Sequence, residues 1–223
     1  MSWINILILL QTMILVNSIQ YLPYRHIRLQ LLDLYHIYNS KEVSLEHIVP
    51  QSIFKKINPE ISRDMHNIIM YPSLLNSHRS NYRYVNKLVL DDTTVILDKV
   101  GNPIPYTGPF IDSRFCLKSN KYKTYYPRPL YRGSISRACM YIAKQYPQYS
   151  KEVLDYLIDP YVLLTWHHQH PVSDFDKRKN DKIYELQGNY NSYIDNPQSM
   201  VTDIEKWVGK TINTYKYYRY IPN

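Results

Sequence analysis

The chain has 223 residues, a formal net charge of +8 and only two cysteines, Cys116 and Cys139. This length supports one substantial hydrophobic core, and so few cysteines exclude a disulfide-rich scaffold and a zinc site built from cysteines. The excess of lysine and arginine, interleaved with many of the 24 tyrosines, favours a polyanionic partner, because cations attract phosphate and aromatic rings stack on bases. An AT-rich genome would encode a similar composition, so nucleic-acid binding needs support from motifs. One bridge between the two cysteines and a reduced, buried pair are equal alternatives.

The N-terminal segment contains an apolar run, 4–16, whose length matches the core of a signal peptide and falls short of a membrane span. Val16 and Ser18 are small enough for cleavage after Ser18. No lysine or arginine precedes the run, so an amphipathic first helix packed on the domain is the alternative. We therefore expect residues 1–18 to be a signal peptide or an N-terminal apolar segment, followed by one domain over 19–223.

The segment that follows is predicted to fold as a helix and then a strand. Apolar residues at roughly helical spacing predict a helix within 20–38. Apolar residues at every second position predict a short strand over 42–49, which ends at Pro50. The strand therefore ends close to a glutamate–histidine pair.

A second strand and a helix are predicted next. The strand, over 65–71, returns after a polar loop and stops before Pro72. Ser73 is suited to cap a helix that runs to Tyr82. The order is therefore strand, loop, strand, helix.

The remainder of the chain changes character twice. Between 84 and 129 it is rich in strand and turn residues, which predicts surface hairpins and loops. Helical spacing then returns in four stretches, 134–146, 153–157, 161–166 and 174–187, the last ended by Gly188.

The stretch 46–81 holds the groups that a metal-dependent phosphodiesterase needs. Mg²⁺ prefers oxygen ligands and is usually held by one or two protein groups plus substrate phosphate, which suits Glu46 and Asn76. Neighbouring side chains on a strand point to opposite faces, so Glu46 and His47 must lie where the strand ends or bends. There the imidazole can take a proton from the attacking water. Taken alone, a Glu-His-x-x-Pro motif is weak, because such pairs are common on ordinary surfaces and in cores.

The later motifs make the pattern specific. Ordered blocks spanning residues 45–197 resemble the bacterial endonuclease I family, secreted nonspecific nucleases built on a ββα-metal, or His-Me finger, core. The blocks are Glu46-His47-Ile48-Val49-Pro50-Gln51-Ser52, Asp64-Met65-His66-Asn67, Asn76-x-x-Arg79-Ser80-Asn81, Arg132-Gly133-x-x-x-Arg137-Ala138, Trp166 through Pro171-Val172, and Arg178-x-Asn180 followed by Gln187 through Asp195.

The resemblance implies an α+β fold, a single mixed domain with a ββα-metal core surrounded by helices, which assigns 19–223 to an endonuclease I-like nuclease domain. It further implies that His47 is the general base, that Glu46 and Asn76 bind Mg²⁺, and that the products carry 5′-phosphates. Mn²⁺ and Ca²⁺ are alternative hard cations for the same oxygen ligands.

Other matched residues are expected to support or extend this site. We expect Arg79 and Arg137 to belong to the catalytic machinery. We also expect Arg79 or Arg132 to bind substrate phosphate through the rigid fork of guanidinium donors. The alternative for Arg79 is a salt bridge on the helix surface. Three polar residues are expected to orient their neighbours by hydrogen bonds: Asp64, Asn67 and Asn81.

Two further features are weaker. The block from Gln187 to Asp195 is expected to support the core. It departs from the family's Gln-Gly-Asn-Arg-Asn-Pro-Phe pattern at Tyr190 and Ser192, which removes one arginine and one proline. The cluster His167-His168-x-His170 suggests zinc, but it has no matching partners downstream.

The sequence thus predicts an Mg²⁺-dependent nonspecific endonuclease that acts on DNA, with RNA as a second candidate substrate. We expect a secreted monomer without stable membrane association after signal removal; an intracellular or virion-associated protein is the alternative. Two other functions remain open: a catalytically silent nucleic-acid-binding or packaging protein, and a structural protein anchored in a membrane by its first 18 residues.

Overall fold

The computed structural model describes residues 19–55, 58–87, 90, 93–105 and 115–209. The signal-peptide prediction falls on residues 1–18, which lie outside these ranges. In the part of the chain that is described, no helix is both long and apolar enough to cross a lipid bilayer.

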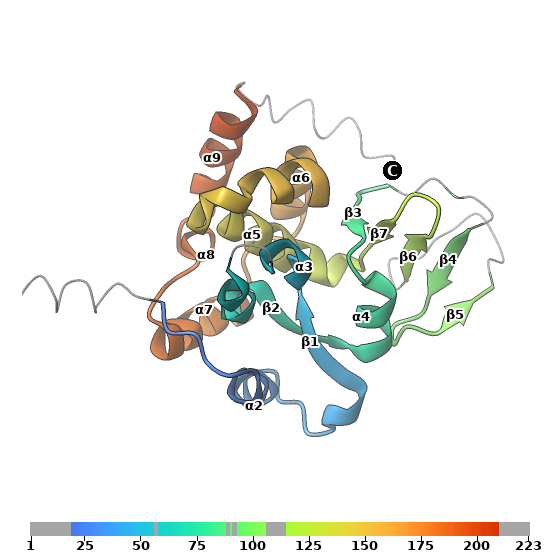
Figure 1. The fold of residues 1–223 in the computed structure, drawn as a ribbon, viewed down its shortest axis with the longest axis horizontal. Coiled ribbons are helices and arrows are strands. Elements are labelled where there is room, and N and C mark those ends of the chain that lie inside the picture. The colour runs from blue at the N-terminus through green and yellow to red at the C-terminus, as the bar shows by residue number, and fades with distance from the viewer. Residues whose placement is uncertain (1–18, 56–57, 88–89, 91–92, 106–114, 210–223) are drawn as a thin grey trace, which may run out of the picture.

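Two antiparallel strands, β1 (Val43–His47) and β2 (Ile68–Pro72), lie near the middle of the molecule, and α4 (Ser73–Arg79) follows them directly (Figure 1). Their register pairs Glu46 with Ile69 and His47 with Ile68. The predicted order of strand, loop, strand and helix is therefore confirmed. The predicted cap is wrong: Pro72 occupies the N-cap position and Ser73 is already helical, because the fixed φ of proline leads the strand straight into the first turn.

Both faces of this two-stranded sheet are covered. On one face, Ile27 and Leu31 of α2 (Tyr24–Leu34) form a cluster with Ile68 and Met70. The other face, with Tyr71, belongs to the main core, which α4 and α5 (Pro129–Gln145) complete. Because β2 is buried on both faces, its sequence is a continuous apolar run and does not alternate.

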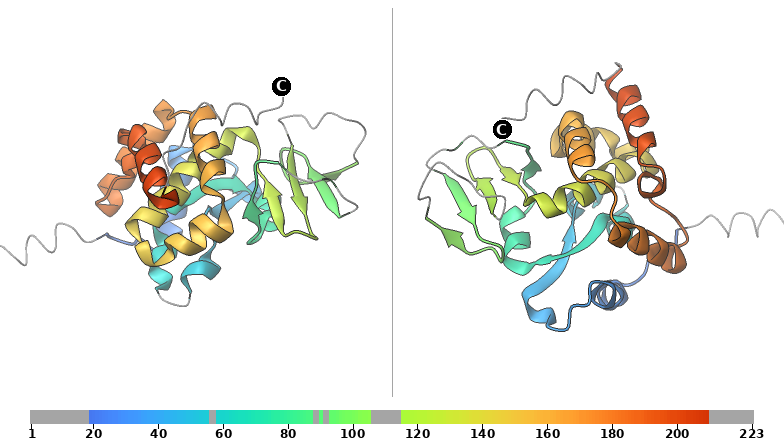
Figure 2. Two further views of the ribbon diagram at one scale, coloured as in Figure 1. Left: turned by 90° about the horizontal axis from the view of Figure 1, so that it is seen from above. Right: turned by 180° about the vertical axis from the view of Figure 1, so that it is seen from behind.

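Helices from the second half of the chain surround this centre (Figures 1 and 2). α5 packs against α6 (Pro160–Gln169). α7 (Asp174–Gln187) begins with a capping box formed by Ser173 and Asp176 and ends at Gly188, whose φ of 86° provides the left-handed terminus. The shorter or peripheral helices are α3 (Gln51–Phe54), α8 (Ser192–Asp195) and α9 (Gln198–Val208). Short 3₁₀ turns cover Ser40–Glu42, Pro59–Arg63, Met65–Asn67 and Pro147–Tyr149, and Glu152–Leu157 is a π-helical turn.

A second, five-stranded sheet lies to one side of the helices (Figure 2). Its order is β3 (Arg83–Tyr84), β7 (Thr124–Tyr126), β6 (Cys116–Ser119), β4 (Thr94–Leu97) and β5 (Pro103–Ile104). The prediction of hairpins and loops was incomplete, because β3 pairs in parallel with β7 across some forty residues, a connection that local patterning does not reveal. Gly101, with a φ of 109°, lets the β4–β5 turn lie against α4, since a Cβ there would be 2.6 Å from that of Leu74.

The architecture confirms the predicted α+β class, with a ββα unit surrounded by helices. Cys116 and Cys139 are both free and buried, so the structure contains the reduced pair and not the bridge.

Candidate active site

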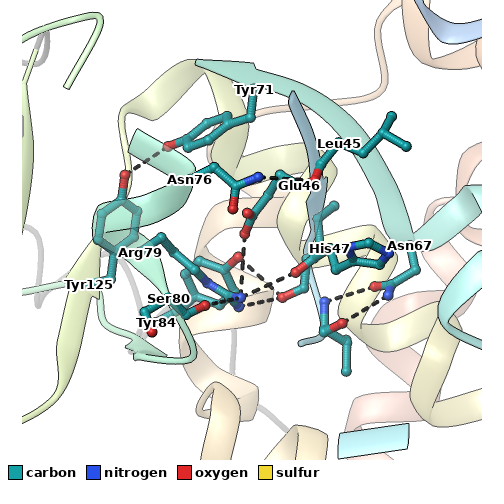
Figure 3. A network of polar contacts seen from close by, with 12 residues as sticks. Leu45, Glu46, His47, Asn67, Tyr71, Asn76, Arg79, Ser80, Tyr84 and Tyr125 are labelled. Atoms are coloured by element: carbon teal, nitrogen blue, oxygen red, sulfur yellow. Dashed lines mark hydrogen bonds and ion pairs between the residues drawn. The ribbon is translucent and has the colours of Figure 1, made fainter. Parts of the chain in front are cut away.

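The end of β1 sends two consecutive side chains in opposite directions (Figure 3). Glu46 points toward α4, whereas His47, the last residue of the strand, points to the side of Asn67. Alternation along a strand dictates this divergence. The carboxylate and the imidazole can therefore act on the same substrate only at the strand end.

Glu46 and Asn76 place oxygen atoms in the space between β1 and α4 (Figure 3). The Asn76 amide nitrogen donates to Ser44 Oγ at 2.9 Å and to Leu45 O at 3.0 Å, which uses both amide hydrogens and leaves Oδ1 as the group available to a cation. The Glu46 side chain is buried, and its Oε1 has no hydrogen-bond partner among the described residues. A carboxylate and an amide oxygen are the donor set that a hard cation prefers.

Burial has a clear electrostatic consequence for Glu46. Desolvation raises the pKa of its carboxyl group to about 7, and the opposing effect of Arg79 is too small to cancel it. Glu46 Oε1 makes no hydrogen bond among the described residues, and the Arg79 guanidinium 3.4 Å away offsets only part of its desolvation, so a bound cation would stabilise the charged carboxylate further. The described residues contain no group of three or more His, Cys, Asp or Glu side chains that could enclose a metal. The pair therefore fits a cation such as Mg²⁺, which completes its coordination with water and phosphate.

Arg79 lies beneath this pair and is only 2% exposed. Asn76 and Arg79 are three residues apart on α4, so they share the face that packs on β1. The Arg79 Nη1 atom lies 3.4 Å from Glu46 Oε1, and the guanidinium also donates to the carbonyls of His47, Ile48 and Ser80. Its Cζ stands 4.6 Å from the ring centre of Tyr84. The guanidinium is thus occupied by protein groups around both candidate residues of β1, and it is not on the helix surface.

His47 is half-buried in a separate set of contacts. Its Nε2 lies 3.1 Å from Gln51 Nε2, and the Tyr24 ring meets the imidazole edge-on at 5.6 Å. Burial lowers the pKa of His47 to about 4, although a hydrogen bond to the Ser62 backbone opposes the shift, and Arg79 adds to it. His47 is therefore neutral at physiological pH, the state that a proton acceptor requires.

The sequence of the chain also matches a known protein family. Residues 35–198 match the Endonuclease I family. The chain belongs to this family. No curated protein matches the chain significantly. Endonuclease I proteins are nucleases, so membership assigns the chain to hydrolases that act on nucleic acid. The matched segment includes β1, β2, α4 and the helices α5 to α8, whereas α2 lies before it.

Asn67 extends the endonuclease I ββα unit beyond the end of β1. Its Oδ1 accepts from Val49 N at 2.8 Å, and its Nδ2 donates to Val49 O at 2.9 Å. The Asn67 carbonyl also accepts from Ile48 N at 2.9 Å. The side chain thus replaces a strand residue in the ladder and fixes the two residues that follow His47.

Asp64 is completely buried and organises the loop before β2. Its Oδ2 accepts from the hydroxyls of Tyr141 and Tyr146 at 2.8 and 2.6 Å. Its Oδ1 accepts from His66 N at 2.9 Å and from Gln187 Nε2 at 2.8 Å. The predicted orienting role for Asp64 and Asn67 thus agrees with their hydrogen bonds, whereas Asn81 is exposed in the turn after α4.

The Gln187 block joins the same network. Gln187 Oε1 accepts from Met65 N at 2.8 Å, which ties the end of α7 to the turn before β2. Asn180 and Asn191 are also buried, and the backbone nitrogen of Asn191 donates to Asn180 Oδ1 at 2.9 Å. Tyr190, where the family has arginine, stacks on Tyr184 with ring centres 4.2 Å apart. These contacts support the core and are not directed at Glu46.

The two arginines of α5 are also buried. Arg137 forms an ion pair with Asp176 at 3.0 Å and donates to His170 O at 2.9 Å. Arg132 donates to Pro127 O at 3.0 Å and lies 4.2 Å from the Tyr126 ring centre, but its Nη2 has no hydrogen-bond partner among the described residues. Neither contacts Glu46 or His47 through any hydrogen bond found in the described ranges.

Sequence patterns did not reveal the two neighbours of the imidazole. Gln51 lies in the matched Glu46–Ser52 block, so its position in that motif was an available signal. Tyr24 lies far upstream, outside residues 35–198, and no local pattern connects it to His47.

Proposed function

We propose that the protein is an Mg²⁺-dependent endonuclease that hydrolyses phosphodiester bonds in DNA with little sequence preference, and that RNA is a second substrate. The observation that carries the proposal is the arrangement around β1. A buried carboxylate oxygen without a hydrogen-bond donor lies beside the Asn76 amide, and a neutral imidazole ends the same strand.

Each side chain has a distinct chemical role in this proposal. Glu46 and Asn76 hold Mg²⁺, which when bound offsets the negative charge that develops on the phosphate and the leaving oxygen. His47 takes a proton from water as the water oxygen bonds to phosphorus and the bond to the 3′ oxygen breaks. The 3′ oxygen leaves with a proton from solvent, and the new end carries a 5′-phosphate. Positioned base catalysis of this kind contributes about 10² to 10⁴-fold to the rate.

Arg79 is assigned a positioning role here. To reach a phosphate, its guanidinium would have to leave three backbone carbonyls and an ion-pair partner inside the protein. Breaking a buried ion pair in this way, without a replacement partner for the charge left behind, costs about 3 to 5 kcal/mol. We propose that Arg79 instead fixes the backbone of His47 and the charge on Glu46. Arg132 is the better candidate for an additional contact to phosphate, because among the described residues it has one hydrogen bond to give up, to Pro127 O, and an unpartnered Nη2.

The competing function is a nucleic-acid-binding protein whose nuclease centre is silent. The presence of Glu46, His47 and Asn76 together, each held by specific contacts, favours the enzyme, since binding alone needs none of these contacts. A silent protein should bind nucleic acid with strong salt dependence. It should not cleave the nucleic acid, whichever divalent cation is added.

The test is an assay of plasmid cleavage with Mg²⁺ and with EDTA, using wild-type protein and Glu46→Gln. We expect nicking that requires Mg²⁺, 5′-phosphate ends in the products, and severe loss in Glu46→Gln. The matched control is Glu60→Gln, because the Glu60 side chain is 59% exposed and, among the described residues, its ion pair is with its neighbour Arg63. Cleavage in EDTA equal to that in Mg²⁺ would rule out the proposed metal role.

A further inference from the structure

The imidazole of His47, at the end of β1, is held by residues from two helices. Gln51 is the first residue of α3, and Tyr24 is the first residue of α2. The Gln51 amide nitrogen lies 3.1 Å from His47 Nε2 and donates to the Tyr24 hydroxyl at 2.7 Å. The Gln51 amide thus connects the ring nitrogen of His47 to Tyr24, which lies 23 positions earlier in the chain than His47.

The chemistry of the amide fixes the direction of these bonds. An amide NH₂ has two hydrogens and accepts nothing, so His47 Nε2 must accept from Gln51. A neutral imidazole that accepts at Nε2 carries its hydrogen on Nδ1. His47 also has a hydrogen bond to the Ser62 backbone, and because Nε2 is paired with Gln51, we assign this bond to the hydrogen on Nδ1. Both ring nitrogens are therefore satisfied in one tautomer only.

The chain of hydrogen bonds continues to the backbone without conflict. The Tyr24 hydroxyl accepts from Gln51, so its own hydrogen is directed to Ser62 Oγ at 2.7 Å. Ser62 Oγ in turn donates to Pro59 O at 2.5 Å. Each hydroxyl donates once and accepts once, and the series ends on a carbonyl that can only accept. Ser62 thus supports the imidazole twice, through its backbone and through its side chain.

We propose that Gln51 and Tyr24 are positioning residues for the catalytic base, and that they hold His47 in the tautomer whose Nε2 faces the attacking water. This inference rests on the proposed nuclease function. The amide of Gln51 occupies the direction from which a water must approach Nε2. During the reaction the water takes that position and donates to His47, while Gln51 remains attached to Tyr24 and donates to the water oxygen.

The location of both residues makes this proposal testable without disturbing the core. Gln51 is half-buried, and 37% of Tyr24 is exposed. Tyr24 makes its hydrogen bonds through the hydroxyl and contacts the imidazole through the ring. Tyr24→Phe therefore removes the hydrogen bonds and keeps the ring contact. Gln51→Met keeps the length of the side chain and removes both amide hydrogens.

The kinetic test compares Gln51→Met and Tyr24→Phe with wild type under saturating Mg²⁺. We expect kcat to fall about tenfold or more in Gln51→Met, part of the 10² to 10⁴ that a positioned base supplies, with KM for DNA and the Mg²⁺ requirement unchanged. Tyr24→Phe should show a smaller loss of the same kind. Gln145→Ala, at the exposed end of α5, is the matched control and should not differ from wild type. Unchanged kcat in Gln51→Met would overturn the proposal, as would a change in KM alone.

A second readout does not depend on activity. The ¹⁵N shifts of the His47 ring, measured at fixed pH on full-length protein with Mg²⁺, report which nitrogen carries the hydrogen. We expect one neutral tautomer, with the hydrogen on Nδ1, in wild type and a mixture in Gln51→Met. If wild type shows this tautomer but no cleavage, the nuclease function fails and the positioning of His47 stands. A ring with its hydrogen on Nε2 in wild type would overturn the positioning proposal itself.

Discussion

Arg79 and Glu46 form an ion pair inside the protein, with Nη1 3.4 Å from Oε1 and side chains that are 2% and 4% exposed. Buried ion pairs seldom add much net stability, but removing one partner strands the other charge. Here the arginine also donates to the carbonyls of His47 and Ile48, the two residues that follow Glu46. The pair therefore links the candidate cation site to the backbone of the proposed base.

Arg79→Met is the first test of that relationship. We expect a loss of about 3 to 5 kcal/mol in the free energy of unfolding, because Glu46 loses its partner and three carbonyls lose a donor. Urea unfolding measures the change. The control is Arg63→Met, whose ion pair with Glu60 is exposed, so the loss there should stay within about 1 kcal/mol. Equal losses in the two variants would contradict a buried supporting role for Arg79.

Asn76→Ala tests the second proposed cation ligand. The variant loses Oδ1 and also the bonds to Ser44 and Leu45, so we expect the Mg²⁺ concentration for half-maximal cleavage to rise at least tenfold. A titration of cleavage rate against Mg²⁺ measures the shift. Asn81→Ala is the control, because Asn81 lies exposed only a few residues further on. If Asn76→Ala needs no more Mg²⁺ than wild type, Asn76 is not a ligand.

The pH dependence should follow Glu46. Its pKa of about 7 means that, without metal, the carboxyl group gains a proton as the pH falls through 7. Mg²⁺ competes with that proton, so the acid limit of activity should move to lower pH as Mg²⁺ is raised. His47, with a pKa of about 4, stays neutral in this range and does not set the limit. Rate profiles at several Mg²⁺ concentrations test this, and a fixed acid limit would contradict it.

The same shift predicts how stability changes with pH. The pKa of Glu46 is raised in the folded protein from its ordinary 4.5 to about 7, so the folded state binds the proton more tightly than the unfolded state. The contribution of Glu46 to stability is therefore present below about pH 4.5 and is lost as the pH rises through 7 in metal-free protein. Glu46→Gln should remove this part of the pH dependence, as thermal unfolding in EDTA would reveal. Identical pH profiles for both proteins would contradict the raised pKa.

Asp64→Ala tests the frame around the site. Four donors converge on this carboxylate, and its removal leaves two buried tyrosine hydroxyls without their acceptor. We expect destabilisation of about 3 kcal/mol or more. Asp98→Ala is the comparison: its carboxylate also accepts several bonds, but in an exposed turn, so the loss should be near 1 kcal/mol. A mild effect of Asp64→Ala would contradict the framing role.

The features predicted correctly from sequence are those with local causes. The alternation along β1, Pro50 after it, and Gly188 at the end of α7 act within a few positions, so each could be read directly. The resemblance of ordered motifs then singled out Glu46, His47 and Asn76 as the candidate site residues, a prediction that the experiments above test. Spacing alone would not have distinguished them from an ordinary surface pair.

The features that sequence missed depend on contacts between distant segments. Which way Arg79 points is decided by the packing of α4 on β1, and an arginine in a motif reads equally well as exposed. The approach of Tyr24 to His47 requires α2 to fold back over the ββα unit. The parallel pairing of β3 with β7 likewise leaves no local trace.

The most direct test of the account is the single-turnover rate of plasmid cleavage by His47→Ala at saturating Mg²⁺, compared with His26→Ala, which alters an exposed histidine of α2. Binding of DNA by both variants should match wild type, which separates chemistry from affinity. We predict that His47→Ala cleaves about 10² to 10⁴-fold more slowly, while His26→Ala is unaffected. Cleavage by His47→Ala at the wild-type rate would contradict the assignment of His47 as the base.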